Sequence, residues 1–167
     1  MSFRLPERLR LQPALLDRLT DDAVGQKTEP VEARVLTRQQ LRQAVLRDLE
    51  WLLNAVQPQR IDAARYPYAA ASTLNYGLPP MAGGQASMLH IGSLEAAITQ
   101  AITTFEPRIL GDTLHVKAVE SESVLDTHNV IQIEIRGMLW AQPVPLELLI
   151  RTQLDLESGQ VVVSEAR

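Results

Sequence analysis

The 167-residue chain contains no cysteine, which excludes a disulfide framework, thiolate zinc sites, iron–sulfur clusters and a cysteine nucleophile. Its seven aromatic residues are too few for a polysaccharide cleft or a base-stacking platform. No apolar run approaches the roughly 20 residues of a membrane span, and the first residues lack the apolar core of a signal peptide. We therefore expect a cytoplasmic protein without direct membrane insertion.

Positive charge is also in short supply. The chain has 16 basic and 20 acidic side chains, so its net charge of −4 argues against a nucleic-acid partner. Residues 1–65 carry 11 basic and 9 acidic side chains, whereas residues 66–167 carry 5 and 11. Fourteen of the basic residues are arginines, which suit fixed ion pairs at interfaces, although a G·C-rich genome would give the same enrichment.

Residues 1–36 predict an N-terminal arm with one short helix. Leu15, Leu16 and Leu19 follow helical spacing, and the polar stretch after them is typical of a loop. So little apolar surface cannot fold alone, and we expect the arm to dock on another surface. Residues 37–167 are expected to form a single α+β domain.

A first amphipathic helix is predicted over residues 37–56. Thr37 and Gln40 have the spacing of a capping box, in which a hydroxyl and an amide satisfy free N–H groups at the helix start. Asp48 projects about 20° from Leu41, at the edge of the apolar face, so its carboxylate needs a partner. The apolar face combines Leu41, Val45, Leu49, Leu52 and Val56, widened by Leu46 and Leu53.

A second amphipathic helix is predicted over residues 93–106. Ser93 is placed to cap its start, Glu95 lies in its first turn, where the helix dipole favours an acidic residue, and Pro107 stops it. Residues 57–91, between the two helices, are expected to form an irregular loop. The apolar face of the second helix consists of Leu94, Ala97, Ile98, Ala101, Ile102 and Phe105.

From residue 112 onward the apolar residues recur with a period of two. Alternation over residues 114–118, 131–139, 146–154 and 161–163 predicts three to four strands, each with one buried and one exposed face. Short turns join them into an antiparallel meander. Helices that precede all strands indicate an α+β fold, in which both helices pack on one face of the sheet.

No motif for catalysis or metal binding is found. The three histidines lack ligand spacing, and the chain has neither a nucleophile elbow nor a phosphate-binding loop. Glycoside hydrolysis needs two carboxylates about 5 to 9.5 Å apart. Asp48 and Glu106 are a pair that could approach, but Arg108 would compete as their ion-pair partner. We therefore predict no catalytic residue, no metal site and no cofactor.

Glu106, Pro107 and Arg108 form a charged corner directly after the second helix, called the corner below. The proline fixes the turn between a glutamate and an arginine, which could engage a complementary pair on a partner. The alternative is an ion pair between Arg108 and Asp48 within the chain, and the spacing alone favours it.

Four segments form a recognisable pattern when taken together: Pro13–Leu19, Leu41–Asn54, Ser72–Pro79 and Phe105–Arg108. In this order and at this spacing they resemble the TssE family of type VI secretion baseplate subunits, which is similar to the lysozyme-related wedge protein of contractile phage baseplates. The resemblance runs from about residue 10 to residue 165. It departs from the family pattern at Pro80, where the family usually has an aspartate.

The resemblance implies a non-enzymatic adaptor, recruited from the cytoplasm to a membrane-docked baseplate. The corner, with Glu106, Pro107 and Arg108, would bind the wedge formed by TssF and TssG, while Asp48 and Glu50 hold it in place. The C-terminal sheet would template the TssB–TssC sheath by strand exchange, because an open antiparallel edge can accept a strand. TssK is a further implied partner. A phage baseplate homologue and a peptidoglycan-acting, lysozyme-like glycosidase remain as alternatives.

Overall fold

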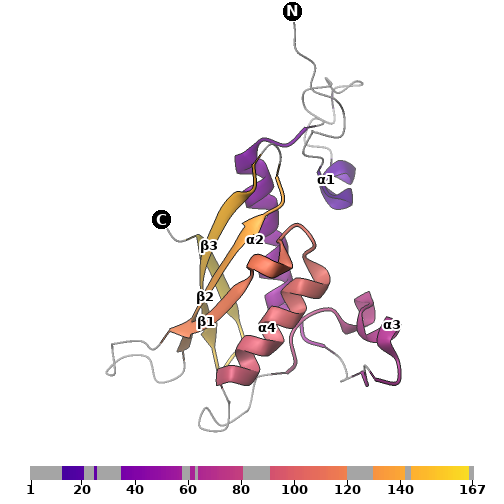
Figure 1. Cartoon of the computed structure of the whole chain (residues 1–167), viewed down its shortest axis with the longest axis vertical. Coiled ribbons are helices and arrows are strands. Elements are labelled where there is room, and N and C mark those ends of the chain that lie inside the picture. Colours follow the sequence, from indigo (N-terminus) through magenta and orange to yellow (C-terminus); the bar gives the residue numbers. More distant parts are fainter. Residues whose placement is uncertain are drawn as a thin grey trace, which may run out of the picture.

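The computed structural model, shown in Figure 1, describes residues 13–20, 25, 35–57, 61–62, 64–80, 91–119, 130–141 and 144–165. Its helices are α1 (Leu15–Leu19), α2 (Arg38–Asn54), α3 (Pro67–Ala70) and α4 (Ile91–Phe105), with short 3-10 turns η3 (Thr73–Asn75) and η5 (Gly111–Thr113). Its strands are β1 (His115–Val119), β2 (Val130–Leu139), β3 (Leu146–Asp155) and β4 (Val161–Glu165). Helices first and strands afterwards confirm the predicted α+β class.

The four strands form one antiparallel meander in the order β1-β2-β3-β4. Its longest pairing joins β2 and β3, and it runs over the full length of both strands. Successive side chains of a strand point to opposite faces, so Ile133 and Ile135 of β2 are buried whereas Gln132 and Arg136 are exposed. This alternation confirms the predicted period-two segments and leaves one face of the sheet toward solvent.

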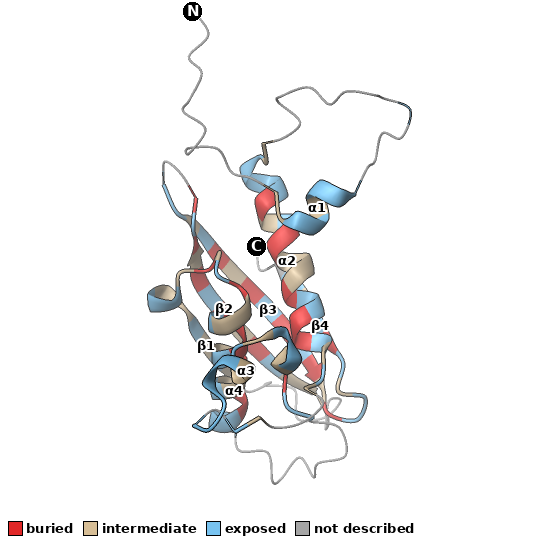
Figure 2. Ribbon diagram, turned by 90° about the vertical axis from the view of Figure 1, so that its right-hand side faces the viewer, coloured by how far each residue is buried: buried red, intermediate tan, exposed pale blue. Residues whose placement is uncertain are grey.

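α2 and α4 pack on the other face of the sheet, as the sequence predicts. α2 lies against β4, α4 lies against β1, and the two helices also contact each other (Figures 1 and 2). Their apolar faces and the sheet form one core, in which each large side chain contributes about 1.5–3 kcal/mol through burial. The largest fully buried apolar members are Leu49, Leu52, Leu94, Ile102, Ile133, Ile135, Leu139, Leu148, Ile150 and Leu154.

The start of α2 follows the prediction, but its end does not. The Gln40 N–H donates to the Thr37 hydroxyl at 3.2 Å and the Thr37 N–H donates to Gln40 Oε1 at 2.8 Å, which confirms the capping box. The helix ends at Asn54, two residues before Val56. The chain leaves the helix there because the Ala55 carbonyl accepts the Leu78 N–H at 2.8 Å, a contact with a distant segment that replaces a bond within the helix. Val56 is 63% exposed, so its predicted place on the buried face is wrong.

The start of α4 also differs from the prediction. The helix begins two residues earlier, since the backbone before Ser93 adopts helical geometry, and the predicted cap at Ser93 is therefore wrong. Glu95 reaches the sheet, where its carboxylate accepts the Ala118 N–H at 2.7 Å. This bond joins the helix to the edge strand β1. The helix ends before Pro107, as predicted.

Candidate functional site

The corner is built around a buried carboxylate. Glu106 follows the last turn of α4, where its N–H donates to the Ile102 carbonyl at 2.8 Å, and the residue is 3% exposed. Arg108 Nε donates to Glu106 Oε1 at 2.6 Å, and Arg108 Nη2 donates to Glu106 Oε2. Pro107, between them, is exposed. The glutamate is thus held inside the fold, and the proline and the arginine form the outer surface of the corner.

Asp48 binds the same guanidinium from α2. Arg108 Nη2 donates to Asp48 Oδ2 at 2.6 Å, while Asp48 Oδ1 accepts bonds from Arg47 Nε at 2.9 Å and Arg47 Nη2 at 2.8 Å. Arg47 Nη1 in turn donates to Asp17 Oδ1 of α1 at 2.6 Å. Glu106, Arg108, Asp48, Arg47 and Asp17 therefore form a continuous row of alternating charges, called the ion ladder below. It joins α1, α2 and the corner.

The ion ladder raises the pKa of both of its arginines. Burial lowers the pKa of Arg108, but the hydrogen bonds and charges of Glu106 and Asp48 outweigh this effect and raise the pKa above its usual value. The hydrogen bond that Arg47 donates to Asp17 is the largest contribution that raises the pKa of Arg47. The intramolecular pairing of Arg108 with Asp48, which the spacing alone favours, is therefore present in the structure.

Tyr76 belongs to this site, although its sequence context predicts no role for it. Its ring meets the ring of Phe105 edge to face, with the centroids 5.2 Å apart. Burial, followed by the negative charges of Asp48 and Glu106, raises the pKa of the Tyr76 hydroxyl. Tyr76 lies in a loop without periodicity, so no helical or strand pattern could place it beside the corner.

A clamp at the end of α2 positions Tyr76. The Gln57 N–H donates to the Leu78 carbonyl at 2.9 Å, and Gln57 Nε2 donates to the Gly77 carbonyl at 2.9 Å. Gly77 adopts φ of +110°, and a Cβ there would lie 2.3 Å from the Ala55 carbonyl oxygen. The close approach therefore requires glycine. Residues 57–91, predicted as irregular, contain part of this clamp together with α3 and η3, while residues 58–60, 63 and 81–90 lie outside the described residues.

We expect Tyr76 to make stability fall at high pH. Because its pKa is raised in the folded protein, the unfolded chain loses this proton first, so the stabilisation is complete below about pH 10 and decreases above it. Urea denaturation at a series of pH values from about 9 to 11.5 should show this decrease in the wild type. The Tyr76→Phe variant should show a smaller decrease, and identical pH profiles for the two proteins would contradict the assignment.

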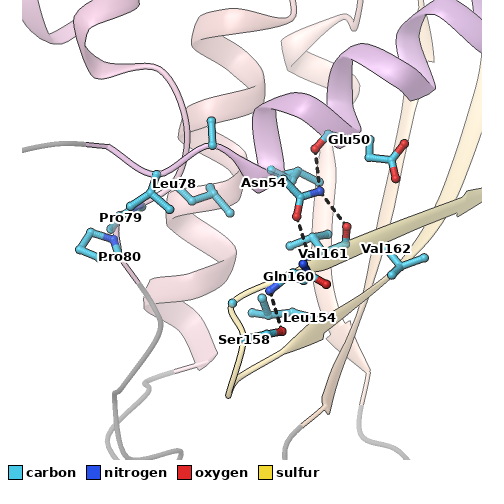
Figure 3. A pocket seen from close by; sticks show the side chains of 14 residues that line it. Glu50, Asn54, Leu78, Pro79, Pro80, Leu154, Ser158, Gln160, Val161 and Val162 are labelled. Atoms are coloured by element: carbon cyan, nitrogen blue, oxygen red, sulfur yellow. Dashed lines mark hydrogen bonds between the residues drawn. The ribbon is translucent and has the colours of Figure 1, made fainter.

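Glu50 lies away from the corner. Two helical residues rotate its side chain by about 200° relative to Asp48, and it lines a cavity of about 560 Å³ at the C-terminal end of α2 (Figure 3). Within the described residues, the bonds of the ion ladder do not include Glu50. Asp48 thus contacts the corner directly. No bond among the described residues joins Glu50 to the corner, and its supporting role stays a prediction.

The same cavity borders the edge strand β4. Asn54 Nδ2 donates to the Val161 carbonyl at 2.8 Å, and the Val161 N–H donates to Asn54 Oδ1 at 2.9 Å, as Figure 3 shows. The Val161 backbone therefore points outward from the sheet. Alternate residues of an antiparallel strand share this direction, so the N–H and carbonyl groups of Val163 and Glu165 also face outward. Past Asn54, no other described residue bonds to the outward backbone groups of β4, whereas Glu95 occupies the edge of β1 at Ala118.

Neither a metal site nor a membrane span is found in the part of the chain that the structure describes. Within it, no group of three or more histidine, aspartate and glutamate side chains is arranged to hold a metal ion. His115 contacts the Thr113 carbonyl, and His90 and His128 lie outside the described residues. The helices of this part are too short or too polar to cross a membrane.

Comparison with known proteins identifies one family. The model of a family described as baseplate wedge protein gp25 matches residues 39–144. The matched range starts in α2, includes α4 and the corner, and extends beyond β2, so it contains every residue of the ion ladder except Asp17. Comparison with curated proteins and with solved structures gave no match.

Proposed function

Because the chain belongs to the baseplate wedge protein gp25 family, we propose that it is a non-enzymatic adaptor linking the TssF–TssG wedge of a type VI secretion baseplate to the TssB–TssC sheath. The family match, which spans the corner, is the observation that carries this proposal. Membership implies a structural role among other baseplate proteins. We also propose a cytoplasmic protein that is recruited to the membrane-docked complex, with TssK as a further component of it.

The exposed part of the corner supports the wedge interaction. Arg108 uses Nε and Nη2 within the ion ladder, and its Nη1 has no acceptor among the described residues. A partner carboxylate or carbonyl can therefore bind a guanidinium that Glu106 and Asp48 already hold in place. Trp140 lies beside this surface, because its backbone N–H donates to the Arg108 carbonyl at 2.7 Å. The residue is half-exposed, so its side chain can serve as an aromatic anchor.

The open edge of β4 supports the sheath interaction. The outward groups of Val163 and Glu165 have no hydrogen-bond partner within the described residues, so a strand from another chain can pair with them. The edge of β1 is less available, because a strand added there would have to displace the Glu95 carboxylate from Ala118. We therefore place strand addition at β4.

The ion ladder disfavours the glycosidase alternative. Hydrolysis of a glycosidic bond needs two carboxylates that both face the substrate. Asp48 and Glu106 share one guanidinium, and Glu106 is buried within the fold. The pair is therefore arranged to fix Arg108, and no observation in the described residues favours catalysis.

Two surface variants should separate the two contacts of the adaptor. Pro107→Glu places a charge on the exposed part of the corner without touching the buried carboxylate, and Val163→Pro removes an outward N–H from the open edge. In capture assays with purified TssF–TssG and TssB–TssC, Pro107→Glu should lose the wedge and keep the sheath. Val163→Pro should lose the sheath and keep the wedge.

The matched control is Val163→Ala, which loses the same side-chain packing but keeps the N–H, and it should retain both partners. Thermal melting monitored by circular dichroism shows whether each variant is folded before capture is scored. A wild-type protein that binds neither complex would overturn the proposal. A Val163→Pro variant that still captures the sheath would overturn the assignment of β4.

A further inference from the structure

α1 is oriented against the usual rule for surface helices. Its leucines face away from the body of the protein, with Leu15 72% and Leu19 73% exposed. Its acidic residue Asp17 points inward and pairs with Arg47 of α2. An amphipathic helix normally packs its apolar side on the core and exposes its charges. In Figure 2, α1 is accordingly coloured as exposed over most of its length.

This orientation leaves an apolar stripe for contact with another molecule. Leu15 and Leu19 are four residues apart and lie on the same side of the helix, with Leu16 beside them. No residue of α1 is buried, so the leucines add nothing to the core of this chain. The ion pair between Asp17 and Arg47 fixes the helix with its stripe outward, because Arg47 is itself held by Asp48.

We infer that α1 is a second docking element, whose leucine stripe packs into an apolar groove between helices of the partner that binds the corner. The inference rests on the proposed wedge interaction. The ion ladder supports this occupant, because an unbroken row of hydrogen-bonded ion pairs, each 2.9 Å or shorter, connects Asp17 with Arg108. A molecule that docks at the corner is therefore within reach of α1.

Charge defines the groove further. Arg18 is exposed and lies about 60° from Leu15 around the helix, at the margin of the leucine stripe. The exposed side of α1, which carries the leucine stripe, is thus apolar with a basic margin. Such a surface fits an apolar groove with an acidic rim. A five-residue helix with leucines at these positions forms a short ridge, and such ridges pack into the grooves between side chains of a facing helix.

The test compares equally exposed leucines inside and outside the stripe. The full-length Leu15→Ser/Leu19→Ser variant should bind immobilised TssF–TssG at least tenfold more weakly than the wild type. The control Leu74→Ser removes a leucine that is 68% exposed on η3 and should bind like the wild type. Both variants should melt at the wild-type temperature, because none of these leucines is buried. Arg18→Glu should weaken binding more than Arg18→Gln, through repulsion by the acidic rim.

Each outcome has a distinct meaning. If Leu15→Ser/Leu19→Ser binds as tightly as the wild type, the docking role of α1 is wrong while the adaptor proposal stands. If Leu74→Ser loses TssF–TssG binding to the same extent, the docking role of α1 is also wrong, because the loss then reflects general surface hydrophobicity. A large drop in the melting temperature of the double variant overturns the docking role as well, because the leucines then contribute to packing within the chain. If the wild type fails to bind TssF–TssG, the adaptor proposal fails and this inference fails with it.

Discussion

Replacing Arg108 with alanine should lower the free energy of unfolding by about 3 kcal/mol, a large effect for a residue proposed to act at an interface. The substitution leaves the buried carboxylate of Glu106 without its cation, and Asp48 loses the same partner. Breaking one member of a buried ion pair costs more than losing an exposed one, because the remaining charge stays desolvated. Urea denaturation at neutral pH, followed by circular dichroism, measures the difference.

Two companion variants identify the cause of this loss. Arg108→Lys keeps a positive charge but not the paired geometry of a guanidinium, so its stability should lie between alanine and wild type. Arg108→Ala combined with Glu106→Gln removes the unpaired negative charge of the buried glutamate. This double variant should recover part of the lost free energy of unfolding. An Arg108→Ala variant as stable as the wild type would contradict this prediction. It would show that the ion ladder is not desolvated, and that Arg108 acts only in binding a partner.

The stability effect also changes how binding data for Arg108 are interpreted. The intramolecular ion pair and the proposed wedge contact are compatible, because Glu106 and Asp48 orient the guanidinium through Nε and Nη2, and Nη1 has no acceptor among the described residues. Loss of wedge binding in Arg108→Ala can therefore follow from lost contact or from lost fold. Pro107→Glu, which leaves the buried pair intact, distinguishes these two causes when both variants are assayed below their melting temperatures.

The sheet and the main helices were predictable because their residues repeat with a fixed period. The alternation around Ile133 and Ile135 specifies a half-buried strand, and the spacing from Leu41 to Leu52 specifies a helix face. The place of Asp48 at the margin of that face also predicted that it needs a partner, and Arg108 supplies it. Local spacing thus accounts for the fold class and for one contact of the site.

The remaining features depend on contacts between distant segments. The end of α2 is fixed by Leu78, which takes the carbonyl of Ala55, and no local signal near Val56 reveals this competition. The pairing of Arg47 with Asp17 likewise joins residues 30 positions apart. Such contacts are set by tertiary packing, which overrides local propensity and spacing. For the same reason, no helical or strand periodicity places Tyr76 beside the corner, and only the structure shows that it lies there.

Replacing Gly77 with alanine should lower the free energy of unfolding by about 3 kcal/mol or more, because two penalties add. The backbone at φ +110° is strained for any residue with a side chain. The new Cβ would also lie 2.3 Å from the carbonyl oxygen of Ala55, a backbone atom that cannot rotate away. Relief requires that the clamp between the loop and the end of α2 opens. Urea denaturation with circular dichroism measures the loss.

Gly92→Ala is the matched control, because nothing lies within 4 Å of the Cβ it would add in the first turn of α4. It should be neutral or stabilising by up to about 1 kcal/mol, since alanine favours helix. In Gly77→Ala, opening of the clamp should also move Tyr76 away from Phe105 and admit water to Glu106 and Arg108. We therefore expect Gly77→Ala to weaken wedge binding under conditions where it is still folded. Unchanged stability and binding would show that the loop moves independently of the corner.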